Sequence, residues 1–172
     1  DRDVTGVQTC ALPIYWGTEY SFKPSDYQRE YAKKLADFGA DIIIGHHPHV
    51  IQPVEYITNK DGKKVLVAFS LGNFISAQDG AAQMLGAALN FTVTKDNNTG
   101  EVTVGDIFAT PVVTQFEGNY SNIRVYPFSK YTKELADKHG IKSVSPEFSY
   151  DYLVKTFKNV IGDFAKTDSN QK

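Results

Sequence analysis

Apolar residues follow a helical period in some stretches of this chain and form continuous runs in others, and these patterns predict its elements. Ser25 can cap a helix over residues 26–38, with Gln28 completing a capping box. The helically spaced apolar residues of this segment are expected to form a stripe that packs against the core. They are Tyr27, Tyr31, Leu35 and Phe38. A strand buried on both faces is then predicted over residues 41–44, because Ile42, Ile43 and Ile44 form a continuous apolar run after Asp41.

The rest of the chain is predicted mainly as strands. Pro53 places a strand over residues 50–58 at a sheet edge or a bend, and residues 65–69 predict a second buried strand. A hairpin, a further strand and two helices follow, at residues 84–94 with 101–116, 122–128, 131–139 and about 149–165. His139, at a predicted helix end, is expected to be a cation that favours the helix dipole. The pattern predicts an α/β fold of layered helices and strands.

Three of the four histidines lie within four positions, directly after the first buried strand. A proline disfavours helical backbone in the residue before it, so His47, followed by Pro48, is expected to be extended. Side chains alternate along an extended segment, which points His47 and His49 one way and His46 the other. The pair could bind a metal through neutral imidazole nitrogens, or the three could be hydrogen-bonded loop histidines. Spacing alone leaves both interpretations open, because two histidines fall short of a complete ligand set.

Four further residues are candidates for the same region. Glu19 could be a metal ligand, a partner that orients a histidine, or a solvated carboxylate. Ser70 and Asn73 follow the second buried strand, where Asn73 could orient a ligand or hold the turn. Trp16 is the only tryptophan of the chain. The carboxyl ends of strands in open α/β sheets are where ligands usually bind, so we expect Ser70 and Asn73 near the histidine loop if the two buried strands are neighbours.

Residues 1–14 do not continue naturally into the sequence from Tyr15 onward, and we interpret them as a non-native junction segment. They contain Cys10, the only cysteine. If the segment is foreign, the remaining chain has no thiolate for a metal site or a disulfide. The alternative is a natural strand with the sequence ALPIYW that pairs with a sheet edge.

Composition restricts the classes of function. The 172 residues are 41% hydrophobic and carry a net charge of −2, as expected for an ordinary soluble domain. There is no basic stripe that could neutralise phosphates, so we expect no nucleic-acid partner. No apolar run reaches the length of a membrane span and no signal peptide is recognisable, so we expect any anchor to lie outside this sequence.

Three linked motifs resemble the CapA family of poly-γ-glutamate capsule synthesis proteins. They are YWGTEY at residues 15–20, GADIIIGHHPHV at 39–50 and SLGNF at 70–74. The resemblance covers residues 15–128 and leaves residues 129–172 as a helical extension. It implies the C-terminal portion of a metallophosphatase-like β-sandwich flanked by helices, in a bacterial protein associated with the cell surface.

The resemblance also implies site residues and ligands. It makes His47 and His49 ligands of divalent metal ions of the Mn, Fe or Zn type. Implied partners are an anionic polymer or a phosphorylated small molecule, together with membrane proteins of capsule synthesis. The family pattern has a histidine where this chain has Tyr15, and its first half, with an acidic metal motif and an Asn-His motif, is absent here. We therefore expect an incomplete metal site.

Three functional hypotheses remain open. The intact parent could be a metal-dependent hydrolase, with His46 or Glu19 assisting ligands or transferring protons. It could instead be a binding or assembly module for polymer synthesis and export, with a structural metal or none. This chain alone could also be inert, because truncation would expose strand edges; we expect it to lack activity by itself.

Overall fold

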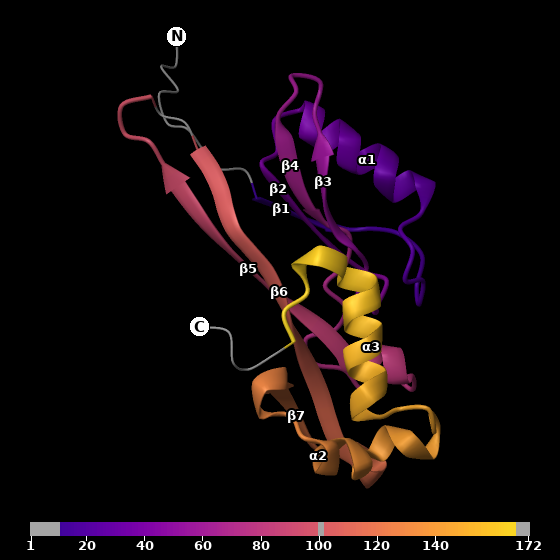
Figure 1. Ribbon diagram of the computed structural model, residues 1–172. Helices are drawn as coiled ribbons and strands as arrows, with labels where there is room; N and C mark the ends of the chain where they lie inside the picture. Colours follow the sequence, from indigo (N-terminus) through magenta and orange to yellow (C-terminus); the bar gives the residue numbers. More distant parts are fainter. Residues whose placement is uncertain (1–10, 100–101, 168–172) are drawn as a thin grey trace.

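A four-stranded sheet forms the first layer of the structure, a computed structural model that describes residues 11–99 and 102–167 (Figure 1). Its strand order is β1-β2-β4-β3. The bounds are β1 (Ala11–Tyr15), β2 (Ile42–His46), β3 (Val54–Thr58) and β4 (Lys64–Ala68). β1, β2 and β4 are parallel, whereas β3 is an antiparallel edge strand that begins directly after Pro53. The predicted buried strands and the edge position of the Pro53 segment are confirmed.

A three-stranded antiparallel sheet of order β5-β6-β7 forms the second part. It consists of β5 (Leu85–Lys95), β6 (Val102–Glu117) and β7 (Ser121–Pro127). β5 and β6 make a long hairpin that runs alongside the first sheet (Figure 1), where residues 102–104 line a cavity with Tyr56 and Leu66. Helix α2 (Lys133–Asp137) and helix α3 (Tyr150–Ile161) follow. The mixture of helices and layered sheets confirms the predicted α/β class.

Short 3-10 turns connect these elements. They are η1 (Ala81–Met84), η2 (Gly118–Tyr120), η3 (Phe128–Lys130), η4 (Gly140–Ser143) and η5 (Gly162–Phe164). None of the helices in the described part of the chain is both long and apolar enough to cross a membrane.

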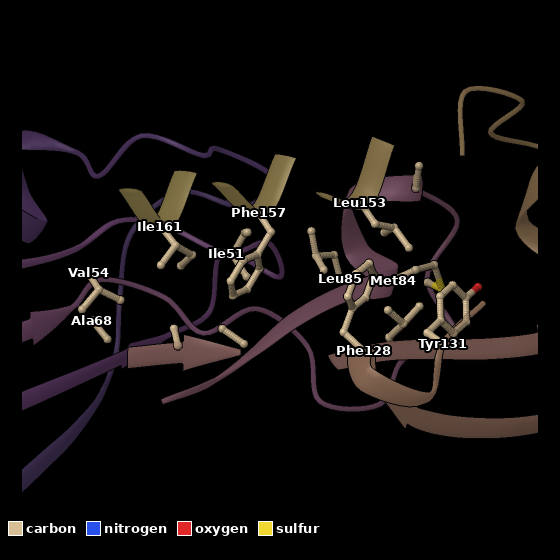
Figure 2. Close-up of a cluster of buried hydrophobic side chains, with 14 of the residues drawn as sticks. Ile51, Val54, Ala68, Met84, Leu85, Phe128, Tyr131, Leu153, Phe157 and Ile161 are labelled. Atoms are coloured by element: carbon tan, nitrogen blue, oxygen red, sulfur yellow. The ribbon is translucent and has the colours of Figure 1, made fainter. Parts of the chain in front are cut away.

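Two hydrophobic clusters hold the layers together, one on each face of the first sheet. Ile43, Val67 and Phe69 belong to the smaller cluster, whereas Ile42 and Leu66 belong to the larger one. Side chains alternate along a strand, so β2 and β4 contribute to both clusters. In the larger cluster, residues of α3 such as Phe157 and Ile161 lie over Ile51, Val54 and the second sheet (Figure 2). The predicted burial of β2 on both faces is confirmed.

Helix α1 (Asp26–Asp37) begins where the sequence predicts, but it buries a different face. Ser25 and Gln28 form the capping box, and Gln28, Ala32 and Ala36 are the buried residues. The small alanines allow the helix to lie close to the sheet, where a face of larger side chains would not fit. The packing of this helix therefore depends on small and amide side chains.

The predicted core stripe of α1 is thus wrong for its aromatic members. Tyr27, Tyr31 and Phe38 are 53%, 37% and 88% exposed. Tyr27 and Tyr31, one helical turn apart, instead contact each other with ring centroids 4.3 Å apart. Only Leu35 of the stripe packs against the smaller cluster.

The prediction that His139 is a cation at a helix end is also wrong. Its side chain is buried against the rings of Phe116 and Phe148. Its Nδ1 accepts a hydrogen bond from the N–H of Ile141 at 2.9 Å, so the proton lies on Nε2, which donates to the carbonyl oxygen of Thr114 at 2.8 Å. Burial lowers the pKa of His139, and the bond to Thr114 raises it by less. The imidazole is therefore a neutral core residue.

Acid should consequently destabilise the protein through His139. Its folded-state pKa is below its ordinary value, so the unfolded chain takes up the proton more readily. The stability contribution is complete above a pH of about 6.5 and is lost as the pH falls through the folded-state pKa. Urea unfolding at several pH values should show a shallower acid loss in His139→Gln than in the wild type. Equal slopes would contradict a buried neutral imidazole.

Part of the segment interpreted as a non-native junction takes part in the fold. Residues 11–15 form β1, which pairs in parallel with β2 in the register Tyr15 to His46. The alternative interpretation of the ALPIYW segment, a strand that pairs with a sheet edge, therefore agrees with the structure. Cys10 and the rest of residues 1–10 lie outside the described residues, and the non-native origin of the segment stays a prediction.

Candidate metal centre

Three parallel strands end at one edge of the first sheet, and the candidate residues gather there. β1 ends at Tyr15, β2 ends at His46, and β4 ends two residues before Ser70. The loop after β2 carries His47 and His49. The expected location at the carboxyl ends of the strands matches this arrangement.

The backbone of the histidine loop is not extended as predicted. His47 has φ of 105° and His49 has φ of 60°, values that non-glycine residues rarely adopt. Pro48 disfavours helical backbone in His47, but the chain satisfies this restriction by turning into the positive-φ region. His47 and His49 nevertheless lie on one side, with ring centroids 6.1 Å apart. Non-glycine residues held at positive φ are costly and gather at functional sites.

Glu19 completes a cluster with these two histidines. One potential ligand atom from each of Glu19, His47 and His49 lies within 4.8 Å of the other two. The Nε2 atom of His49 is 3.7 Å from the Oε1 atom of Glu19. A hydrogen bond of 2.7 Å from the N–H of Tyr20 to the carbonyl oxygen of Pro48 joins the two loops. Among residues 11–99 and 102–167, no other group of three such donors comes together.

The cluster fits a divalent metal ion. The Nδ1 atom of His47 is buried and has no hydrogen-bond partner among the described residues, and a ligand would remove the cost of leaving it unpaired. Ligand atoms bound at about 2.1 Å to one tetrahedral zinc ion lie about 3.4 Å apart, so donors within 4.8 Å of one another need to close by at most about 1.4 Å. Glu19 is half exposed and has the freedom to make that movement.

His49 is held by hydrogen bonding and by an aromatic contact. Its Nδ1 atom is 3.0 Å from the Oδ1 atom of Asn73. The ring of Tyr20 stacks on it with centroids 6.1 Å apart. Asn73 therefore contacts a candidate ligand through Oδ1, while its Nδ2 atom bonds to Gln78 and Gln83, so its contacts fit both of its sequence interpretations. Tyr20 is a contact that sequence reasoning missed.

Tyr15 lies against the other histidine. Its ring centroid is 4.3 Å from that of His47, although the Tyr15 side chain is 69% exposed. Tyr15 thus covers the side of His47 without entering the cluster of donors.

His46 lies outside the cluster and lines a different part of the molecule. Its cavity of about 360 Å³ is formed with the segment from Leu71 to Ile75 and with Ala87. The ring retains solvent contact, and its partial burial lowers the pKa of His46. It therefore does not belong to the three-donor group, and its catalytic role stays a prediction.

Trp16 and Ser70 have structural contacts. The Nε1–H of Trp16 donates to the carbonyl oxygen of Phe69 at 2.9 Å, across the position of Gly45. The hydroxyl of Ser70 donates to the carbonyl oxygen of Val50 at 2.7 Å and accepts from the N–H of Gly72 at 3.1 Å. Both residues are buried. They fix the loops that carry the histidines and Asn73.

A buried amide pair supports the Glu19 side of the site and was missed by sequence reasoning. The Nε2 atom of Gln28 donates to the Oε1 atom of Gln52 at 2.7 Å. Gln52 in turn donates to the carbonyl oxygens of Ser21 and Lys23, just after Glu19. The available signal was a glutamine in the otherwise apolar stretch before Pro53, since a buried amide needs partners.

The sequence of this chain is similar to a known protein family and to several curated proteins. Residues 6–78 match the family described as bacterial capsule synthesis protein PGA_cap. The chain is 44% identical over 100 residues to the PGA biosynthesis protein CapA of Bacillus subtilis, covering 56% of this chain and 25% of that protein. It is 41% identical over 85 residues to the capsule biosynthesis protein CapA of Bacillus anthracis, covering 49% and 19%.

A third relative matches a larger share of the chain. The uncharacterized protein y4sH of Sinorhizobium fredii is 30% identical over 152 residues, covering 74% of this chain and 31% of that protein. The chain thus spans less than a third of the length of these curated relatives. The matched family has a metallophosphatase-like fold, in agreement with the layered α/β architecture. All three donors of the cluster lie inside the matched residues.

Proposed function

Over residues 6–78 this chain belongs to the CapA family of bacterial capsule synthesis proteins, and on that premise we propose that it supplies a metal-binding part of a hydrolase-type centre used in capsule synthesis. The proposed ligands are Glu19, His47 and His49. The observation that carries the proposal is the convergence of one donor atom from each of these three residues. The buried Nδ1 atom of His47, which has no hydrogen-bond partner among the described residues, supports it.

The chemistry of the donor set supports a catalytic type of site. If Glu19, His47 and His49 held a divalent metal ion, the ion would supply Lewis-acid chemistry that polarises a water or a phosphoryl oxygen. The chain's own residues supply the rest of the environment. Tyr15 and Tyr20 cover His47 and His49, while Glu19 stays half exposed on the open side. A substrate would therefore approach from the side of Glu19.

The proposal extends to the substrate and to the location in the cell. We propose that the intact protein acts on poly-γ-glutamate or on a phosphorylated precursor, at the bacterial cell envelope and beside membrane proteins of capsule synthesis. The names of the Bacillus relatives support the capsule role. An anionic substrate also suits a metal-centred site, because the cation offsets the negative charge that the substrate brings.

The proposal is tested first by metal binding. The chelator-treated chain should bind about one Mn²⁺ or Zn²⁺ ion in a calorimetric titration, and Glu19→Gln should weaken this binding by at least about 10-fold, since a neutral amide replaces a charged ligand. Glu55→Gln is the matched control, because Glu55 pairs with Arg29 on the surface. Absence of binding by the wild type, or equal affinities for both variants, would overturn the proposed centre.

The role in capsule synthesis is tested in the full-length protein that carries this segment. Glu19→Gln should abolish capsular polymer in a strain that depends on that protein, whereas Glu55→Gln should leave the amount of polymer unchanged. Normal polymer with Glu19→Gln, at an equal protein level, would contradict the role of the cluster in synthesis.

A further inference from the structure

We propose that Asn73 is a positioning residue of the metal centre, which holds the neutral ring of His49 with its proton on Nδ1 and so presents the lone pair of Nε2 to the ion. This inference rests on the proposed function, because it assigns Nε2 as the ligand atom of His49. The juxtaposition that carries it is the distance of 3.0 Å between the Nδ1 atom of His49 and the Oδ1 atom of Asn73.

The orientation of the Asn73 amide is settled by its other contacts. Its Nδ2 atom donates to the carbonyl oxygen of Gln83 at 3.2 Å and to the Oε1 atom of Gln78 at 2.9 Å. A backbone carbonyl oxygen can only accept, so the group that faces Gln83 must be the NH₂ group. The oxygen of the amide therefore faces His49.

This orientation selects one tautomer of His49. A neutral imidazole carries a single N–H, and the amide oxygen facing Nδ1 can only accept a hydrogen bond. The proton is therefore stabilised on Nδ1. The opposite tautomer would set two lone pairs against each other. Nε2 is left unprotonated, 3.7 Å from the Oε1 atom of Glu19 and on the side of the donor cluster.

The backbone of Asn73 is held in place by its neighbours, which keeps its amide oxygen facing His49. A side chain at Gly86 would meet the carbonyl oxygen of Asn73 at 2.2 Å, so strand β5 lies directly against this backbone. On the preceding residue, Gly72 has φ of 67° and its N–H is bound by the hydroxyl of Ser70. A second partner that orients a ligating histidine typically contributes about 10–100-fold in metal affinity.

The tautomer can be measured without any metal. Long-range ¹H–¹⁵N correlation spectra of the metal-free, ¹⁵N-labelled chain distinguish protonated from unprotonated ring nitrogens, and His49→Gln identifies the His49 signals. The wild type and Asn73→Asp should show the Nδ1–H form, because both keep an acceptor oxygen. Asn73→Leu, of similar size but without an acceptor, should lose this preference. Gln78→Leu is the matched control, since it removes a partner of Nδ2 and leaves Oδ1 in place.

Metal affinity supplies the second measurement. Asn73→Leu should bind Mn²⁺ or Zn²⁺ about 10–100-fold more weakly than the wild type, whereas Asn73→Asp should bind within a few-fold of it. A structural role of Asn73 in the turn alone would lower thermal stability without moving the tautomer. Circular dichroism of each variant establishes that it is folded before it is compared.

The two proposals fail in different ways. If the chain binds no metal but Asn73→Leu changes the tautomer of His49, the proposed function is overturned and the positioning role of Asn73 stands. If metal binds and the wild type shows the Nε2–H form, or Asn73→Leu keeps the Nδ1–H form and full affinity, the positioning role is overturned and the metal centre stands.

Discussion

Replacing His47 with alanine is expected to weaken the binding of Mn²⁺ or Zn²⁺ by about 100-fold or more, whereas replacing His46 with alanine should change it by less than a few-fold. His47 belongs to the three-donor cluster, and its buried Nδ1 atom has no hydrogen-bond partner in the part of the chain that the structure describes. His46, its neighbour in sequence, faces a different cavity. Calorimetric titration of the two variants measures the difference.

The pair of variants is its own control, because both remove an imidazole from adjacent positions of one loop. Equal losses of affinity would contradict the separation of the two side chains. A larger loss for His46→Ala would transfer the site to the cavity lined by Leu71 and Phe74.

Replacing Gly45 with alanine is expected to reduce the free energy of unfolding by about 3 kcal/mol, at the upper end of the usual cost of overpacking. A Cβ atom there would lie 2.0 Å from the carbonyl oxygen of Phe69 and 2.4 Å from the Nε1 atom of Trp16. It would therefore disrupt the hydrogen bond between these two residues, which crosses the strand at this point. Backbone atoms of a buried strand cannot move aside cheaply.

Gly105→Ala is the matched control for this prediction. Gly105 lies in β6, and no atom of the described residues outside its chain neighbours lies within 4 Å of the position that an added methyl group would take. Alanine should therefore be neutral or slightly stabilising there. Chemical denaturation of both variants gives the comparison. A loss below about 1 kcal/mol for Gly45→Ala would show that β2 and β4 can separate to accept a methyl group.

Much of the fold follows from local patterns in the sequence. The apolar run at Ile42–Ile44 predicted a doubly buried strand, and Ser25 with Gln28 marked the start of α1. These signals are local, since they depend on burial of a run and on capping within four residues. The prediction of which face of α1 is buried was wrong, because that face depends on how close the helix lies to the sheet. The close approach selects Ala32 and Ala36 over the aromatic residues.

The candidate site was predicted in part. The family resemblance and the spacing both pointed to His47 and His49, and the three-donor geometry agrees with that pair. The expected reason, alternation along an extended segment, was wrong because both histidines have positive φ. The sequence left three interpretations of Glu19 open, and the structure places it beside the histidines, where a hydrogen bond from Tyr20 to Pro48 joins the two loops. Long-range bonds of this kind leave no periodic signal in a sequence.

The bond between Trp16 and Phe69 joins residues that are 53 positions apart, and it sets an order of events during synthesis. The ribosome synthesises the loop that carries Trp16 and Glu19 well before β4 and Phe69. Trp16 therefore lacks its hydrogen-bond acceptor, Phe69, when this loop emerges. The backbone of Asn73 packs against Gly86, so Asn73 reaches its final position only after Gly86 has been synthesised. Because β5 packs against the backbone of Asn73, the contact between Asn73 and His49 is expected to form only after β5 has joined the structure.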